Sequence, residues 1–250
     1  MDSSVMYLEY KKLLRDFEKT PFFGRVAVTH FLKNPSLKDC PIKKFYKDNA
    51  LIIKNKPILG QSIDVNKEEH PSVCGGVTEY LTKIKLAKEL GIDIININFF
   101  DDITKPKYKK LNDEELAFAL YEPDIIYRCG TGYTEERRED KNLIINKAII
   151  LSNISLKLIH ERFPKIESID FHPEGHVLLD GKLAILGDSD LLINNCLIDF
   201  KTKKDSSIQA DDRAQLFAYS INKFIRDGED YDKVFVLNPR HNYMCELVNK

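Results

Sequence analysis

Two short stretches in the second half of the chain place acidic and basic side chains at the spacing of one strand face. Asp188 and Asp190 lie two residues apart in Gly-Asp-Ser-Asp, and Asp199 and Lys201 lie two residues apart in Leu-Ile-Asp-Phe-Lys-Thr. Because successive side chains of a strand alternate between its faces, each pair is expected to share one face. Asn194-Asn195 between them is typical of a hairpin turn, so the two strands are expected to be antiparallel neighbours.

Such a hairpin would bring three carboxylates and one ammonium group into a small area. Two unit charges about 4 Å apart repel by roughly 4 kcal/mol at an effective dielectric constant near 20, so one lysine cannot balance three acids. A bound divalent cation can balance the three acids together with the lysine. Carboxylate oxygens without a nearby cysteine or a histidine pair favour Mg²⁺ or Mn²⁺ over zinc. The plainer alternative for Asp190, Asp199 and Lys201 is a salt-bridge ladder across the hairpin.

The Asp-Phe-Lys triplet adds a backbone ligand and a candidate catalytic group. Phe200 is expected to point into the core, which leaves its carbonyl free as a further metal ligand. Lys201 would position or deprotonate a water molecule beside the metal. A metal-activated hydroxide, held in line with a phosphodiester whose developing charge the cation and the lysine stabilise, is sufficient for hydrolysis.

Residues that follow the triplet are candidates for substrate contacts. Gln215 and Tyr219 are four residues apart in a predicted helix and therefore share one face, where they could hydrogen-bond a phosphate or the lysine. Lys203 and Lys204 adjoin the triplet and are candidates for phosphate contacts, although charge runs are more often simply solvated. His172 and His176 are expected to be solvated turn residues rather than a zinc pair.

Three motifs occur in order along this region: Gly187 to Asp190, Ile198 to Thr202 and Gln215 to Tyr219. Their combination resembles the RecB-like branch of the PD-(D/E)XK nuclease superfamily, which is marked by a Gly-x-x-Asp strand, an Asp-x-Lys-Thr strand and a Gln-x-x-x-Tyr helix. The resemblance implies a restriction-endonuclease-like core with the element order αβββαβ. It also implies that Asp190 and Asp199 are metal ligands and that Lys201 is the catalytic lysine. Gln215 and Tyr219 are implied to be the supporting pair.

One motif of that branch is altered here. The branch usually has a glycine followed four residues later by a histidine near the start of a helix, whereas Gly75 is followed by Glu79. An acid at this position could reach the metal directly or through water. Three glutamates in a later predicted helix compete for the role, namely Glu135, Glu136 and Glu139. Asp188 is a further candidate metal ligand.

The elements that must position these residues follow from periodicity and turn signals. Helices are expected over residues 5–19, 77–90 with Gly91 at its end, 113–121 with Pro123 as its stop, 135–163 and 210–226. Strands are expected over residues 92–100, 166–171 or 176–179, 183–193, 197–203 and 233–237, followed by a strand-like tail. The prediction is an α/β protein with a mixed central sheet and a mainly helical N-terminal extension. We expect one compact domain over residues 1–250, with a helical region at 1–130 that contributes one motif helix and a nuclease core at 131–250.

Composition sets the remaining limits. The net charge of −1 arises from 38 basic and 39 acidic residues, so a site for a polyanion must be a local patch. The five cysteines are scattered without a CxxC pair, which argues against a disulfide framework and a zinc knuckle. No apolar run approaches the roughly 18 residues of a membrane span, and the N-terminus lacks the apolar core of a signal peptide. A cytoplasmic protein without a membrane partner is therefore expected.

Three functions fit these observations. The first is a magnesium-dependent deoxyribonuclease whose N-terminal region shapes the DNA channel or docks a protein partner. Because no GxxxxGK[ST] loop is present, any unwinding would require a separate helicase. The alternatives are a catalytically silent scaffold that binds nucleic acid or a protein partner, and a metal-dependent nuclease that acts on RNA.

Overall fold

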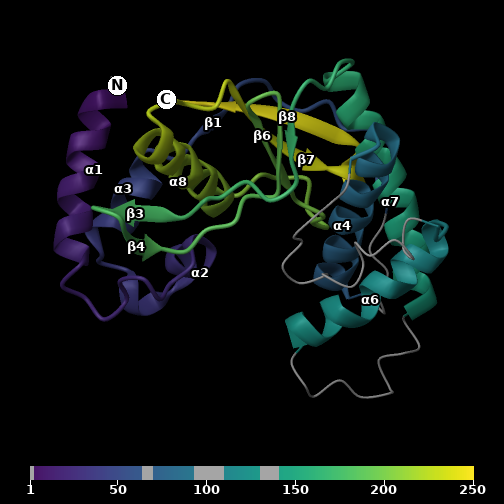
Figure 1. Cartoon of the computed structure of the whole chain (residues 1–250), viewed down its shortest axis with the longest axis horizontal. Coiled ribbons are helices and arrows are strands. Elements are labelled where there is room, and N and C mark those ends of the chain that lie inside the picture. Colours follow the sequence, from purple (N-terminus) through teal and green to yellow (C-terminus); the bar gives the residue numbers. More distant parts are fainter. Residues whose placement is uncertain (1–2, 64–69, 93–109, 130–140) are drawn as a thin grey trace.

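The structure is a computed structural model that describes residues 3–63, 70–92, 110–129 and 141–250 (Figure 1). The helices are α1 (Ser3–Phe17), α2 (Val28–Lys33), α3 (Pro41–Asp48), α4 (Pro71–Leu90), α6 (Asp113–Cys129), α7 (Lys141–Arg162) and α8 (Ala210–Asp227), with the short 3₁₀ helices η1 (Pro35–Leu37) and η3 (Pro239–His241). The strands are β1 (Ile52–Ile53), β2 (Ile169–Asp170), β3 (Val177–Leu179), β4 (Lys182–Ile185), β5 (Leu191–Ile193), β6 (Cys196–Phe200), β7 (Lys233–Asn238) and β8 (Tyr243–Val248).

The central sheet is mixed, as predicted. Its strand order is β1-β8-β7-β6-β5-β2, in which β6 and β7 are parallel and all other neighbours are antiparallel. Strands β3 and β4 form a separate two-stranded sheet. From α7 onward, the strands of the central sheet and the helices beside them appear in the order α7, β2, β5, β6, α8, β7 and β8. Because β6 and β7 are parallel, α8 must cross from one end of the sheet to the other between them.

Helices cover both faces of this sheet, and the alternation of side chains along β6 shows why. Leu197 packs on one face in a core with α8 and the N-terminal helices, whereas Ile198 and Phe200 pack on the other face with α7 and the end of α4. In Figure 1, α8 and α1 to α3 accordingly lie on one side of the strands and α4, α6 and α7 on the other. All five residues of β6 are buried, which is typical of a central strand covered on both faces.

Helix α8 begins and ends at strong local signals. The Gln209 side chain accepts from the N3 backbone N–H, and Asp212 at N3 accepts from the Gln209 N–H, which together form a capping box. Gly228 ends the helix with a φ of 75°, a conformation that glycine adopts without steric cost. The expected helix at 210–226 is therefore confirmed, and its register along the sheet is held from both ends.

The expected strand at 183–193 is wrong, because this segment forms two strands in different sheets. Strand β4 ends at Ile185 and β5 begins at Leu191. Between them the chain makes only isolated bridges, Ala27 to Leu186 and Glu174 to Asp188. Residues 183–186 and 191–193 are apolar, but polar residues separate the two runs. Leu186 and Asp188 bridge to the N-terminal region and to the segment before β3, so no continuous ladder forms.

Helix α6 also differs from its prediction. Asn112 caps its N-terminus, since its Oδ1 accepts from the Glu115 N–H at 2.9 Å. Pro123 does not stop the helix but lies inside it. A proline inside a helix removes one hydrogen bond and crowds the preceding turn. Packing of Leu120, Tyr121 and their neighbours against α4 and α7 offsets that cost and keeps the helix continuous.

The other predicted helices are found with shifted bounds. Helix α4 begins at Pro71, earlier than residue 77, and ends at Gly91 with a φ of 67°, as expected. Residues 135–140 of the expected long helix and most of the expected strand at 92–100 lie outside the described residues. Helix α7 is long and apolar enough to cross a membrane, but half of its most apolar window is buried inside the protein, as in a core helix.

Gly187 occupies a crowded position that allows α8 to approach the sheet. A Cβ atom there would lie 2.5 Å from the Gly175 carbonyl oxygen and 3.1 Å from the ring of Tyr219. Gly187→Ala is therefore expected to lower the free energy of unfolding by about 1–3 kcal/mol through overpacking. Urea unfolding of the purified protein measures this loss.

Gly181→Ala provides the matched control, because Gly181 has a φ of 80° and open space around its Cβ position. Only backbone strain of about 1 kcal/mol is expected there. A Gly187→Ala protein as stable as the wild type would contradict the packing described.

Candidate functional site

The hairpin of β5 and β6 brings the two central acids together. Asn194 and Asn195 have φ values of 48° and 57°, which is the twisted turn that the sequence predicts. Leu191 pairs with Ile198, so the register places Asp190 beside Asp199, one step beyond the last paired residues. The Phe200 backbone N–H donates to Asp190 Oδ2 at 2.7 Å and fixes that carboxylate against β6.

Lys201 forms an ion pair with Asp199. Its Nζ lies 2.7 Å from Asp199 Oδ2, and the lysine side chain is 16% exposed while the aspartate is 2% exposed. Asp199 Oδ2 is buried, and the Lys201 ammonium group is its partner. The contact therefore joins two opposite charges that are both largely shielded from water.

Burial shifts the protonation of all three groups. It raises the pKa of Asp190 to about 6, with the Glu79 carboxylate adding to the rise. Burial likewise raises the pKa of Asp199 to about 7; Lys201 opposes this and Asp190 adds to it. For Lys201 burial disfavours the charged form, but Asp199 and Asp190 outweigh it and raise the pKa of the ammonium group. Facing carboxylates that resist ionisation in this way are stabilised by a bound cation.

Helix α8 places the predicted supporting pair next to these acids. Gln215 Nε2 donates to the Tyr219 hydroxyl at 2.8 Å, as their spacing of one helical turn allows. Tyr219 is 2% exposed, and its ring edge touches the positions of Gly175 and Gly187. Burial raises the pKa of the Tyr219 hydroxyl, and the carboxylates of Asp190 and Asp199 add to the rise, which places the hydroxyl within their electrostatic reach.

Helix α4 approaches the site from the opposite layer. A Cβ atom at Gly75 would lie 3.1 Å from Thr202 Oγ1, so the glycine lets the helix come close to the chain just after β6. Glu79 lies one turn further along, and its charge acts on Asp190. Among the described residues, Glu79 is therefore the upstream acid beside the pair. Glu135, Glu136 and Glu139 lie outside the described residues.

Lys83 also belongs to this cluster, although the sequence analysis did not single it out. Its Nζ lies 2.6 Å from Glu79 Oε1, and its side chain is only 1% exposed. The Lys83 charge lowers the pKa of Asp190 and therefore also reaches the acids. Its position four residues after Glu79 on a predicted helix was the signal that could have identified it.

The remaining predicted residues lie further out. Asp188 is exposed and bridges to Glu174, so the strand alternation that was expected to join it to Asp190 is not formed. Lys203 forms an ion pair with Asp212. Lys204 is exposed, and its carbonyl accepts from His241 at 2.8 Å. Lys204 is thus open to a phosphate, whereas Lys203 would first have to leave Asp212.

The two histidines are not simply solvated, contrary to expectation. Burial lowers the pKa of His172 to about 4, and Lys83 adds to this effect while Asp170 and Asp188 oppose it. His176 Nδ1 accepts from the Gly187 N–H at 2.9 Å, which supports the turn that enters the site. The chain before β3 folds back over residues 186–190, and this packing partly buries both histidine side chains.

A hard divalent cation fits the donors that are present. Within the described part of the chain, no three histidine, cysteine or acidic side chains stand close enough together to hold a metal. Mg²⁺, however, commonly binds through one or two carboxylates together with water and substrate oxygens. Asp190 and Asp199 supply two carboxylates, which face each other where the β5–β6 hairpin opens. Phe200 is buried as predicted, and its carbonyl directly precedes the Lys201 amide, which donates to Leu237 O at 2.9 Å.

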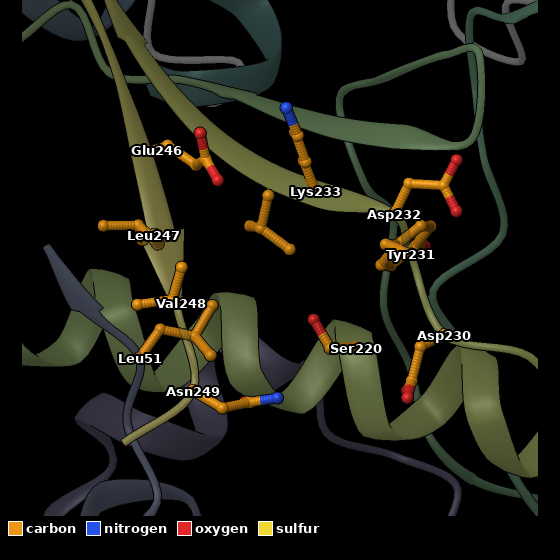
Figure 2. A pocket seen from close by; sticks show the side chains of 11 residues that line it. Leu51, Ser220, Asp230, Tyr231, Asp232, Lys233, Glu246, Leu247, Val248 and Asn249 are labelled. Carbon is orange, nitrogen blue, oxygen red and sulfur yellow. The ribbon is translucent and has the colours of Figure 1, made fainter. Parts of the chain in front are cut away.

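A pocket of about 240 Å³ lies elsewhere, between α8 and the β7–β8 edge of the sheet. Figure 2 shows Ser220 on the helix side and Lys233 and Glu246 on the strand side. Glu246 is already paired with Lys54 at 2.8 Å and with Arg162 at 3.1 Å. None of the acids of the hairpin site lines this pocket, so it is a separate feature.

No family model, curated protein or solved structure matches this chain. The chemistry of the site is therefore the basis for assigning a function.

The raised carboxyl pKa values predict how stability depends on pH without metal. Asp190 and Asp199 have an ordinary pKa of 3.8, near their value in the unfolded chain, and values of about 6 and about 7 when folded. Between about pH 4 and about pH 7 the unfolded chain has released protons that the folded protein still holds, so the free energy of unfolding falls as the pH rises. In EDTA, the free energy of unfolding of Asp199→Asn is expected to fall less over this pH range than that of the wild type. Urea unfolding at several pH values measures the difference.

Asp227→Asn gives a control of opposite sign. Hydrogen bonding to Arg226 lowers the pKa of Asp227, so its contribution is present above the unfolded pKa and is lost as the pH falls. This variant should be less stable than the wild type near neutral pH. An Asp199→Asn profile parallel to that of the wild type would contradict the burial of an ionisable Asp199.

Proposed function

We propose that the protein is a cytoplasmic metal-dependent nuclease that hydrolyses phosphodiester bonds in DNA with Mg²⁺ or Mn²⁺. The observation that carries the proposal is the pair of facing carboxylates, the half-buried Asp190 and the buried Asp199, with Lys201 2.7 Å from Asp199. The pKa of each carboxylate is raised, as is typical of groups placed for function rather than stability. A charge cluster that disfavours its own ionisation costs stability unless a cation completes it.

The arrangement of elements supports the same proposal. The order α7, β2, β5, β6, α8, β7 and β8, with β6 parallel to β7, agrees with the αβββαβ order expected of a restriction-endonuclease-like core followed by one further strand. The three motifs of the RecB-like resemblance lie on the turn into β5, on β6 and the two residues after it, and on α8. In this proposal the β3–β4 hairpin is an insertion within that order.

The roles of the residues follow from their contacts. Asp190 and Asp199 hold the metal, and the Phe200 carbonyl and Glu79 are further candidate ligands. A bound Mg²⁺ polarises a phosphate oxygen and lowers the pKa of a coordinated water molecule. Lys201 is a charged ammonium group, because the acids raise its pKa, and it stabilises the negative charge that develops on the phosphate.

Gln215 and Tyr219 act as a positioning pair in this proposal. Because the Tyr219 hydroxyl accepts from Gln215, its own hydrogen is available for donation toward a phosphate oxygen or a carboxylate. Lys204, which is exposed next to the site, is the better placed of the two candidate phosphate contacts. DNA is the proposed partner, and a helicase or another protein would supply any unwinding.

One observation favours the catalytically silent scaffold as a second candidate. Glu79 is bound by Lys83, so the third acid is occupied and only two carboxylates face each other. In that case the cluster would be a structural charge network on a protein that binds nucleic acid or a protein partner. Cleavage of RNA in place of DNA would use the same residues, and substrate assays separate these possibilities.

The test is cleavage of linear, circular and single-stranded DNA and of RNA in Mg²⁺, Mn²⁺ or EDTA. Cleavage is expected with either metal and not in EDTA. Lys201→Met should lower the cleavage rate by about 10²–10³-fold, as expected when one group that stabilises transition-state charge is lost. Lys233→Ala, at an exposed lysine at the start of β7, is the control and should cleave as the wild type does.

Two results would refute the assignment in different ways. Undiminished cleavage by Lys201→Met would remove the hairpin site from the mechanism. Binding of DNA by the wild type without cleavage in either metal would establish the scaffold in place of the nuclease.

A further inference from the structure

Lys83 is a buried ammonium group that the proposed mechanism does not use. Its side chain is 1% exposed and its Nζ lies 2.6 Å from Glu79 Oε1, while the Glu79 side chain is 17% exposed. The same Nζ lies 5.3 Å from the centre of the Tyr80 ring. A buried charge is costly unless it is paired, so the Glu79 carboxylate is what makes this burial tolerable.

The charges of the site are nearly balanced without a metal. Lys201 pairs with Asp199, and Lys83 pairs with Glu79. Asp190 accepts the Phe200 N–H and, among the residues that the structure describes, is the one carboxylate of the three without an ion pair to a lysine. A divalent cation that bound to all three acids would therefore have to replace one of the two ammonium groups.

Glu79 is the acid that can change partners. Lys83 lies one helical turn beyond it, about 6 Å along the helix axis, whereas Asp190 lies across the interface with the hairpin. Glu79 is more exposed than Asp199, so rotation of its side chain disturbs less packing. Its helix reaches the chain just after β6, where a Cβ atom at Gly75 would lie 3.1 Å from Thr202 Oγ1, and its charge acts on Asp190 from there.

We propose that Lys83 is an internal counter-ion that holds Glu79 in the metal-free protein and competes with the divalent cation for this carboxylate. When the cation binds at Asp190 and Asp199, Glu79 leaves Lys83 and becomes the third acidic ligand. Lys83 is thus a positioning residue that sets metal affinity. The inference rests on the proposed function, because it assumes a metal at the hairpin acids.

Calorimetric titration of Mn²⁺ into the full chain tests this proposal. Lys83→Met removes the competing charge and keeps a side chain of similar length, so it is expected to bind Mn²⁺ roughly tenfold more tightly than the wild type, a difference of about 1.4 kcal/mol. Glu79→Gln should bind more weakly than the wild type. Adding Lys83→Met to Glu79→Gln should then give no gain, because the carboxylate under competition is absent.

Lys223→Met is the matched control. Lys223 is 9% exposed, pairs with Asp227 four residues later at 3.1 Å, and lies 5.5 Å from the Tyr231 ring, so it repeats the surroundings of Lys83 on a different helix. Its substitution should change thermal stability in EDTA but leave the Mn²⁺ affinity unchanged. If Lys83→Met does not fold, Lys83→Gln keeps a polar side chain and carries the same expectation.

The outcomes separate this inference from the function on which it rests. Equal or weaker Mn²⁺ binding by Lys83→Met overturns the counter-ion role, and so does a gain in affinity that persists in the Glu79→Gln background. If either of these results is obtained and the wild type still binds Mn²⁺ and cleaves DNA, the nuclease proposal stands without the counter-ion role. If the wild type binds no Mn²⁺, both proposals fail together.

Discussion

The close approach of two carboxylates, the half-buried Asp190 and the buried Asp199, is the constraint on which the rest of the site depends. Asp190 and Asp199 meet where the β5–β6 hairpin opens, and both have raised pKa values because the sheet and its helices exclude water. Lys201 and the Phe200 N–H reduce the repulsion without removing it. Every neighbouring element either supplies a counter-charge or restricts the solvent that would otherwise screen the acids.

Close backbone approach makes this arrangement possible. Gly187 and Gly175 let Tyr219 pack against the turn into β5, and Gly75 lets α4 reach the chain after β6. At each of these positions, a Cβ atom would crowd the neighbouring element and push the two elements apart. The site is therefore assembled from three layers, with α8 on one face, the hairpin in the sheet, and α4 reaching in from the other face.

The cluster also shows a tension between stability and chemistry. An apolar pair in place of Asp190 and Asp199 would remove two desolvation penalties, whereas the acids make the folded protein sensitive to pH. The Glu79–Lys83 pair is a further buried charge pair in the same small volume. Proteins tolerate such costs mainly where a ligand or a reaction uses the charges.

The sequence alone determined the local parts of this picture, because they depend on spacing along one element. Asp199 and Lys201 on one strand face, the Asn194-Asn195 turn, and Gln215 with Tyr219 on one helix face all follow from periods of two residues and of about 3.6 residues. Most helix positions followed from the same rules, whereas the capping box of α8 was not predicted.

Only the tertiary structure decided the relations between elements. It divided residues 183–193 between two sheets, carried α6 through Pro123, exposed Asp188 and buried Lys83 against Glu79. Each of these outcomes depends on which residues distant in sequence pack together, and a packing energy can override a local preference of a few kcal/mol. The sequence therefore predicted which side chains could do chemistry, while the fold determined which of them meet and which of them are already paired.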